Sequence, residues 1–464
     1  CAEMDLTYPS FEGLRRYPSA ADVAAAAAAE DGEKPRVRSP RMHDITRTKA
    51  VVIMGGPKDG TRFRPLSLNH PKPLFPVAGV PLVYHHLETC ATLPGMTEII
   101  LLGVFPESEV ETFRAAASQR LGIPVKYLRE YAPLGTAGGI YFFRDLIMTN
   151  KPDALIVIHA DICADIPIDD LIDFHASMNE KGNHLTVMST TARKDMAKNY
   201  GCLIGDAETY EVSHYVEKPK SYVSSDISTG VYVFSPSIID DMRDVFVAKH
   251  EAKEPHPEML FLEQDVLTNL AGTGRLFMYK SESFWSQVKT ASSAIYANRH
   301  YLETYRKIRP EAMHSLARSS EDGPTITGDV WIHSTADIHP TAKLGPNVSI
   351  GLEAKVGPGA RIKDSIILNR VQIGSHSVVM NSIVDDGCTI GQWARVEGAP
   401  VGPNPNDPTT AVQPKELFTE RGTLEPSTTI IGTDSKIADS VLVRNVISLP
   451  HKDITEDCKN QIIL

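Results

Sequence analysis

The sequence predicts two folded domains, an α/β domain with a mostly parallel sheet followed by a left-handed parallel β-helix of hexapeptide repeats. Apolar runs alternate with helical patterns from residue 50 to about 235, and apolar anchors recur at every sixth position from 332 onwards. At 464 residues the chain is too long for one ordinary core. We expect the domains over 48–310 and 325–464, with an insertion at 399–429.

The first 47 residues are predicted to be a disordered N-terminal extension. They combine prolines, charges and the alanine run Ala24 to Ala29 with few large apolar side chains. Such a segment buries too little apolar surface to offset the entropy lost on ordering.

The α/β domain is predicted from five strand-like runs, at Glu98–Val104, Val125–Leu128, Ala154–Ile158, His184–Ser189 and Gly230–Phe234. Strands separated by helices pair in parallel through right-handed crossovers, which places helices on both faces of a sheet. Ligands bind such sheets at the carboxyl ends of the strands. Functional residues are therefore expected in the loops after these strands.

A phosphate-binding loop is predicted where the first apolar run, 50–54, ends. The loop and its continuation supply backbone amides and cations from Gly55, Gly56, Gly60, Thr61, Arg62 and Lys72. Glycines let amide groups approach a phosphate closely, and arginine and lysine neutralise its charge. No Gly-Lys-Ser/Thr follows the glycines, so this is not a Walker loop. A plain turn with solvated cations is the alternative, which the full string G-G-…-G-T-R-x-R-P…P-K-P disfavours.

Two further strand ends carry charged candidates. Asp161 follows the apolar run 155–158, where a carboxylate is costly unless it faces a ligand or cation. Because Mg²⁺ prefers few carboxylates plus substrate phosphates, Asp161 is predicted to bind it, whereas Asp165 is the better helix cap. The Glu217-Lys218 pair, followed by proline, is predicted to point into the cleft in preference to forming a solvated surface pair.

A six-residue period predicts the β-helix. Its first anchors are Ile332, Ile338, Leu344, Ile350, Val356, Ile362 and Leu368, and the rhythm returns at Ile373, Val384 and Ile431. In a parallel β-helix each such residue stacks on the equivalent residue of the preceding coil. Solenoids also expose faces that pair with other subunits, so a homo- or hetero-oligomer is expected.

The repeat stops between Ala399 and Ile431. The intervening segment is polar and rich in proline, as in Gly402–Pro408. A loop of this length inside a solenoid is either functional or disordered. We expect the segment to contact another subunit and to modulate activity, with a passive loop as the alternative.

Composition limits the partners. The formal net charge of −11 disfavours a general nucleic-acid binder. The cysteines are far apart and form no CxxC pair, which indicates a reducing compartment. No apolar run approaches the ~20 residues of a membrane span, and no signal peptide is visible. We expect a cytoplasmic protein with no nucleic-acid and no membrane partner.

The glycine loop with Arg62 and Lys72 resembles the signature of sugar-phosphate nucleotidyltransferases, which join a sugar 1-phosphate to a nucleoside triphosphate. The resemblance implies a Rossmann-like domain with a mixed, mostly parallel sheet. It also implies that Arg62, Lys72 and Asp161 serve catalysis and that Asp161 binds Mg²⁺. The usual spacing is G-G-x-G-T-R, and the loop between Gly56 and Gly60 is two residues longer here.

The same resemblance implies roles for the remaining pocket residues. Nucleotide binding is implied for Gly135, Thr136 and Gly138, as well as for Gly55, Gly56, Gly60 and Thr61. Sugar-phosphate binding is implied for Gly201, Glu217, Lys218 and Ser228. Of these, Ser228 stands where the family usually places a sugar-contacting Asn.

From about Lys49 to Leu464 the chain is similar to eukaryotic GDP-mannose pyrophosphorylases, and to their alpha paralogue more than to the catalytic beta one. The similarity is carried by the widened loop 55–61, the run 71–81, Trp393–Gly398 and Asn460–Leu464. It implies a subunit of the complex that makes GDP-mannose from GTP and mannose 1-phosphate. The alpha paralogue is regarded as a product-sensing, regulatory partner of the beta subunit.

Three functions remain open. The first is a regulatory subunit that binds GDP-mannose, and the second is an active guanylyltransferase that uses GTP, mannose 1-phosphate and Mg²⁺. The third is a scaffold like the nucleotidyltransferase-like subunits of the translation factor eIF2B. The retained Lys72 and Glu217-Lys218 argue against the scaffold. In catalytic members the segment near the sugar ends in Trp-x-Asp, but here it is Trp285-Ser286-Gln287, so we expect poor catalysis by the chain alone.

Overall fold

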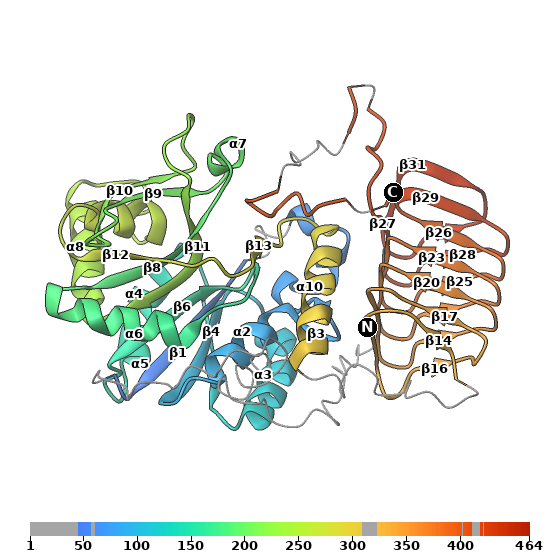
Figure 1. Ribbon diagram of the computed structural model, residues 1–464, viewed down its shortest axis with the longest axis horizontal. Coiled ribbons are helices and arrows are strands. Elements are labelled where there is room, and N and C mark those ends of the chain that lie inside the picture. Colours follow the sequence, from blue (N-terminus) through green and yellow to red (C-terminus); the bar gives the residue numbers. More distant parts are fainter. Residues whose placement is uncertain (1–44, 57–60, 309–322, 401, 411–417, 421) are drawn as a thin grey trace, which may run out of the picture.

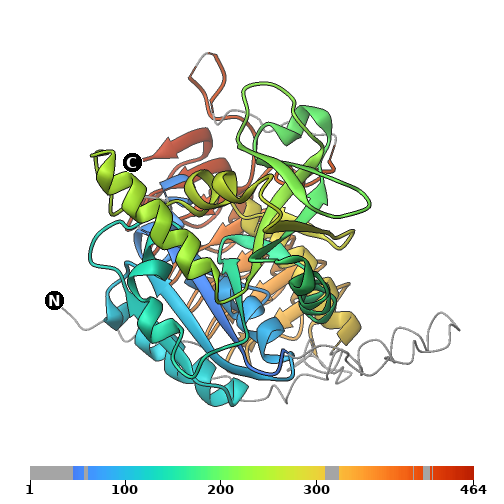
Figure 2. The same cartoon turned by 90° about the vertical axis from the view of Figure 1, so that its left-hand side faces the viewer.

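The computed structural model describes residues 45–56, 61–308, 323–400, 402–410, 418–420 and 422–464. An α/β domain and a β-helix lie side by side, with helix α10 (Ser293–Ile308) between them (Figure 1). Figure 2 looks from the α/β domain, and the coils of the β-helix lie behind it. The predicted fold class, including both domain types, is confirmed.

The α/β domain is built on one mixed sheet. Its main path is, in order, β10 (Val212–Glu217), β9 (Gly201–Gly205), β11 (Asp226–Phe234), β6 (Ala154–His159), β1 (Thr48–Gly55), β4 (Met96–Gly103) and β5 (Val125–Arg129). Beside this path, β8 (Leu185–Thr191) pairs with β11 and with β12 (Leu276–Lys280). The strands from β6 to β5 are parallel, whereas β11 runs antiparallel to both β6 and β8.

Helices cover both faces of this sheet because alternate residues of a strand point to opposite faces. Val52 of β1 packs with α2 (Leu82–Ala91), α3 (Glu107–Leu121) and α6 (Ile168–Met178). Its neighbour Val51 packs with α4 (Gly138–Phe142), α5 (Arg144–Ile147), α8 (Ile238–Glu251) and the π-helix Leu262–Leu267. No helix in the described ranges is long and apolar enough to cross a membrane.

The folded domain begins earlier than the predicted boundary at residue 48. The backbone amides of Thr46 and Arg47 donate to the Asp153 carboxylate, and the Arg47 guanidinium pairs with it at 3.0 Å. The disordered extension predicted over 1–47 is therefore too long at its C-terminal end, because Asp153 binds these residues. The rest of that prediction concerns 1–44, outside the described residues.

The β-helix stacks short parallel strands in three rows. The first row comprises β14 (Thr325–Ile326), β17 (Lys343–Leu344), β20 (Arg361–Lys363), β23 (Val378–Met380), β26 (Arg395–Glu397) and β29 (Leu442–Ser448). The second row comprises β15 (Val330–Ile332), β18 (Val348–Ile350), β21 (Ser365–Ile367), β24 (Ser382–Val384) and β27 (Thr429–Ile431), after which it meets β29. The third row comprises β16 (Asp337–Ile338), β19 (Lys355–Val356), β22 (Gln372–Ile373), β25 (Thr389–Ile390), β28 (Lys436–Ile437) and β30 (Asp453–Ile454), and β31 (Cys458–Ile463) closes against β29.

The six-residue period is confirmed up to Ile362, but the seventh anchor is wrong. Ile350 pairs with Ile367, and Ile367 packs in the core of the β-helix. The chain shortens this step by one residue, with Asp364 in the left-handed region at φ 46°. Leu368 consequently faces the α/β domain, where it packs in the cluster between the domains.

That interdomain cluster is apolar. The first domain contributes Phe63, Phe75, Val288 and Leu302, and the β-helix contributes Trp331, Ile366, Leu368 and Ile383. The ideal Cβ of an alanine at Gly79 would lie 2.3 Å from the Trp331 ring, so only glycine fits there. The two domains therefore share a packed core.

Candidate functional site

The phosphate-binding loop begins where β1 ends. Gly55 has φ 71°, a conformation that favours glycine, and it turns the chain out of the sheet. A short 3₁₀ helix, Thr61–Phe63, follows, in which Thr61 and Arg62 are exposed and Phe63 is buried against Phe75. Phe63 thus fixes the base of the loop beside the predicted Arg62. The predicted Gly60 lies in the stretch 57–60, outside the described residues.

Lys72 and Asp161 form an ion pair near the end of β6, and we call the residues around this pair the pocket. Lys72 Nζ lies 3.1 Å from Asp161 Oδ2, although the two residues come from different loops. Burial alone would raise the pKa of Asp161, but the charges of Lys72 and His159 hold that pKa below its usual value. The carboxylate is therefore ionised and already has a cationic partner.

Gln287 binds the same carboxylate oxygen. Strand β13 (Trp285–Gln287) runs antiparallel to β7 (Ile162–Ala164), which starts just after Asp161. Gln287 Nε2 donates to Asp161 Oδ2 at 3.3 Å. The structure thus places an amide beside Asp161, where the resemblance implies a second carboxylate in catalytic relatives.

On the predicted sugar side, Glu217 and Lys218 form a pair at 2.9 Å. The Tyr215 hydroxyl donates to the other carboxylate oxygen of Glu217 at 2.7 Å. Gly201 lies opposite Glu217 on β9, and an added Cβ would come within 2.0 Å of that hydroxyl. The Ser228 hydroxyl lies 3.2 Å from that of Tyr232. Gly201, Glu217 and Ser228 lie on the adjoining strands β9, β10 and β11, and Lys218 directly follows β10.

The predicted nucleotide loop packs against residues 258–263. Gly135 has φ 81°, and the Gly138 amide donates to the Leu260 carbonyl at 3.0 Å. The Thr136 hydroxyl donates to Glu263 at 2.8 Å and accepts from the Leu262 amide. The Thr136 hydroxyl and the Gly138 amide thus form hydrogen bonds within the protein. Glu263 Oε1 lies 3.3 Å from His159 Nε2, which links this loop to the end of β6.

Sequence reasoning missed Lys289. Its Nζ lies 4.3 Å from the centre of the Tyr200 ring. Burial, followed by the charges of Arg62, Lys218 and Lys72, lowers the pKa of Lys289 to about 8, with Asp161 opposing this shift. The sequence offered one signal for this residue, namely that Lys289 lies two residues after the predicted Gln287.

The insertion of the β-helix also reaches this pocket, as Figure 1 shows near β13. Asn404 Nδ2 donates to Ser286 Oγ at 2.6 Å, and the Tyr200 hydroxyl donates to the Asn406 carbonyl at 3.1 Å. Residues 402–410 therefore contact the α/β domain of their own chain. Contact with another subunit stays a prediction.

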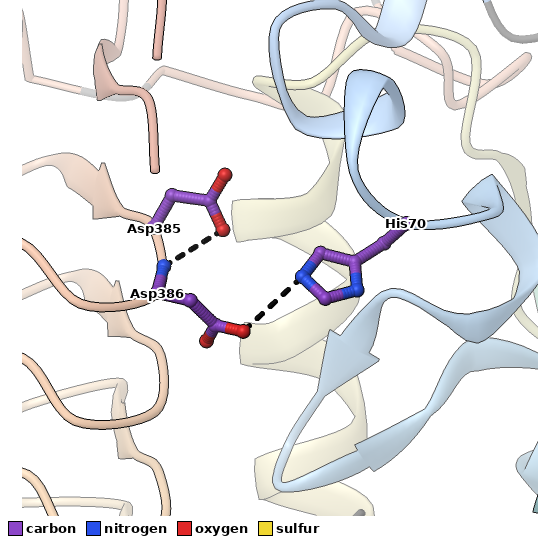
Figure 3. A group of neighbouring side chains, drawn as sticks. All are labelled: His70, Asp385 and Asp386. Carbon is purple, nitrogen blue, oxygen red and sulfur yellow. Dashed lines mark hydrogen bonds and ion pairs between the residues drawn. The ribbon is translucent and has the colours of Figure 1, made fainter. Parts of the chain in front are cut away.

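A second polar cluster links the pocket loop to the β-helix. His70 Nε2 lies 3.2 Å from Asp386 Oδ2 (Figure 3). The neighbouring Asp385 accepts a hydrogen bond from the Thr433 hydroxyl at 2.6 Å. Burial alone would lower the pKa of His70, but its hydrogen bond to Asp386 raises it. Burial, opposed by His70, raises the pKa of Asp385 to about 6. His70 precedes Lys72 by two residues, so the cluster anchors the loop that carries Lys72.

The groups around Asp161 fit a divalent ion poorly. Asp161 Oδ2 accepts hydrogen bonds from both Lys72 and Gln287, so one oxygen of this carboxylate is already engaged by two donors. Mg²⁺ is usually held by carboxylates and substrate phosphates in near-ideal octahedral geometry. Neighbouring cations oppose its entry by like-charge repulsion.

Comparisons with known proteins agree with this arrangement. A family model described as nucleotidyl transferase matches residues 49–304, and one described as the GMPPB C-terminal domain matches residues 326–463. The chain is 49% identical over 426 residues to the mannose-1-phosphate guanylyltransferase regulatory subunit alpha-B of Danio rerio. It is 48% identical over 424 residues to the regulatory subunit alpha of Xenopus tropicalis, and 46% identical over 425 residues to that of Homo sapiens. Each match covers 90% of this chain and 100% of the relative. The chain therefore belongs to the nucleotidyl transferase family, alongside proteins named as alpha regulatory subunits of mannose-1-phosphate guanylyltransferase.

Proposed function

We propose that this protein is the regulatory subunit of a GDP-mannose pyrophosphorylase and binds GDP-mannose in the pocket around Lys72 and Asp161. The observation that carries the proposal is the contact of Gln287 with Asp161 at 3.3 Å. The pocket keeps its cations and the Glu217-Lys218 pair, which suit a nucleotide sugar. An amide in place of a second carboxylate leaves little to hold a catalytic metal ion.

The proposed partner is the catalytic beta subunit, in a cytoplasmic hetero-oligomer. The names of the relatives support a regulatory role, since they refer to a subunit alpha of the guanylyltransferase. The apolar contact between the domains keeps the β-helix beside the pocket, so that a ligand in the pocket lies close to surfaces that another subunit can contact.

The active guanylyltransferase is the second candidate, because Arg62, Lys72, Asp161 and Lys218 are all present. This candidate requires the Mg²⁺ predicted at Asp161, and the side chains around Asp161 fit that ion poorly. The eIF2B-like scaffold is disfavoured because a vestigial pocket gains nothing from cations that repel one another.

Calorimetry tests the proposal directly. The purified full chain is titrated with GDP-mannose, ADP-glucose and UDP-glucose in Mg²⁺ buffer. We expect saturable binding, tightest for GDP-mannose. If a folded sample binds none of the three, the proposed function is wrong. A parallel assay of GDP-mannose formation, with the chain alone and mixed with the beta subunit, separates the regulatory from the catalytic candidate.

A further inference from the structure

The position of Lys289 is fixed by its neighbours. The Val288 amide donates to the Asp161 carbonyl at 2.8 Å, and the Val288 side chain is buried in the interdomain cluster. The Tyr200 ring beneath the ammonium group is itself buried, and its hydroxyl is bound by the Asn406 carbonyl. Lys289 is therefore a built part of the pocket.

The charge of Lys289 is unfavourable among the side chains that surround it. Burial opposes its protonation most strongly, and Arg62, Lys218 and Lys72 oppose it as well, so that Asp161 offsets only part of the effect. A half-buried cation with like-charged neighbours costs stability unless an anion offsets it. The Tyr200 ring offsets part of this cost through the cation–π contact. The arrangement indicates an anionic ligand at this point.

The charge of the cluster suits a diphosphate diester. Its positive members are Arg62, Lys72, Lys218 and Lys289, and its negative members are Asp161 and Glu217. Four cations less two carboxylates leave two positive charges. A nucleotide sugar carries one negative charge on each of its two phosphoryl groups, so it neutralises this surplus. A nucleoside triphosphate carries more negative charge and needs an additional cation.

We propose that the pocket binds the diphosphate of a nucleotide sugar without a divalent metal ion, and that Lys289 supplies positive charge in place of the metal. This inference rests on the proposed function, since it takes GDP-mannose as the ligand. In this proposal Gln287 stands in place of a carboxylate that would bind the metal ion, and Lys289 adds a fixed cation. The pocket then senses the product of the reaction in preference to GTP.

Calorimetry of the full chain with GDP-mannose, in Mg²⁺ and in excess EDTA, tests the inference. We expect dissociation constants that agree within about twofold in the two buffers, and weaker binding of GTP than of GDP-mannose in EDTA. Lys289→Met keeps much of the apolar contact with Tyr200 but removes the charge, and loss of a charge-assisted contact should weaken GDP-mannose binding about 10-fold or more. Lys289→Arg should retain the metal-independent binding.

Lys194→Met is the matched control, because Lys194 lies 5.6 Å from the Tyr222 ring centre as an exposed lysine–tyrosine pair. It should leave the affinity unchanged. Binding that needs Mg²⁺, or that survives Lys289→Met, overturns this inference while the proposed function stands. Absence of binding in both buffers instead removes the proposed function. The comparison of the two buffers uses the unmodified chain, so it holds even if a variant fails to fold.

Discussion

Asn404 donates a 2.6 Å hydrogen bond to Ser286, so the insertion of the β-helix is fastened to the residue between Trp285 and Gln287. The first prediction concerns this contact. Asn404→Ala should release the insertion at a cost of about 1 kcal/mol. The Arg193 amide, which donates to the Pro408 carbonyl at 2.9 Å, should then exchange its hydrogen faster. Hydrogen-exchange mass spectrometry measures this rate.

Thr409→Ala is the control, since the Thr409 hydroxyl binds only Asp407 within the insertion in the described contacts. Equal exchange in the two variants would show that Asn404 does not hold the segment.

Deletion of residues 402–425 should leave the fold intact but change the activity or feedback inhibition of the complex with the beta subunit. An unchanged complex would favour a passive loop.

The second prediction concerns catalysis by the isolated chain. Because Gln287 offers no charge to a metal, GDP-mannose formation should be ~10²–10³-fold slower than by the catalytic subunit. Gln287→Asp should raise the rate in Mg²⁺ buffer, whereas Gln287→Asn, a neutral amide of the same length as aspartate, should not. Initial rates of the purified chains decide this. A rate for the unmodified chain equal to that of the catalytic subunit would contradict the regulatory proposal.

The third prediction is a pH dependence of stability from His70. Because the folded state raises the pKa of His70 above 6.5, its contribution is fully present below that pH and is lost as pH rises through the raised value. Asp385, with its pKa raised to about 6, adds a destabilisation that grows from about pH 4 to pH 6. Asp386, Asp385 and Glu109 favour the charged form of His70, whereas burial and Arg370 oppose it. Both titrations therefore lower the stability of the folded chain as pH rises.

Melting temperatures from pH 5 to pH 8 test this sign. The unmodified chain should lose more stability over the range than His70→Gln, which keeps a polar side chain without a titrating charge. Asp386→Asn should likewise flatten the profile. Parallel profiles for all three proteins would exclude the His70 contact as the cause.

The fourth prediction concerns the packing between the domains. Gly79→Ala should lower the free energy of unfolding by about 1–3 kcal/mol, because the added Cβ would overlap the Trp331 ring and φ is +86°. Gly122→Ala is the control, with φ +67° and no atom within 4 Å of the added Cβ. Gly122→Ala also places a side chain at a positive φ, but without a clash. Equal losses in thermal unfolding would mean that the Trp331 contact adds nothing.

The sequence was sufficient for the features that depend on local pattern. Anchors from Ile332 to Ile362 could be placed because each stacks on its equivalent through a fixed period. The shift that puts Ile367 in the core could not be foreseen, because the anchor pattern does not reveal that the turn at Asp364 is one residue shorter. The positions of Gly55 and Asp161 beside neighbouring strand ends were predictable, because the ends of parallel strands converge at one edge of the sheet.

Contacts made by distant segments were beyond such reasoning. Nothing near His70 indicates that Asp385 and Asp386 will meet it, because the contact exists only once the two domains dock. Lys289 lies two residues after the segment Trp285–Gln287 but belongs to no recognisable sequence motif. Its environment depends on Tyr200, which comes from a distant part of the chain. Thr136 was assigned to a nucleotide, and its hydrogen bonds to Glu263 and Leu262 became visible only in the fold.

The coils on either side of the insertion pair directly, Val384 with Ile431 and Ile390 with Ile437, as though no residues intervened. The pairing of these coils therefore does not depend on the length of the insertion. Each doubling of such a loop costs only ~0.6 kcal/mol of closure entropy. Mutation can lengthen, shorten or rewrite the segment beside the pocket while the coils stay in register. New control of the pocket can thus evolve here without endangering the scaffold.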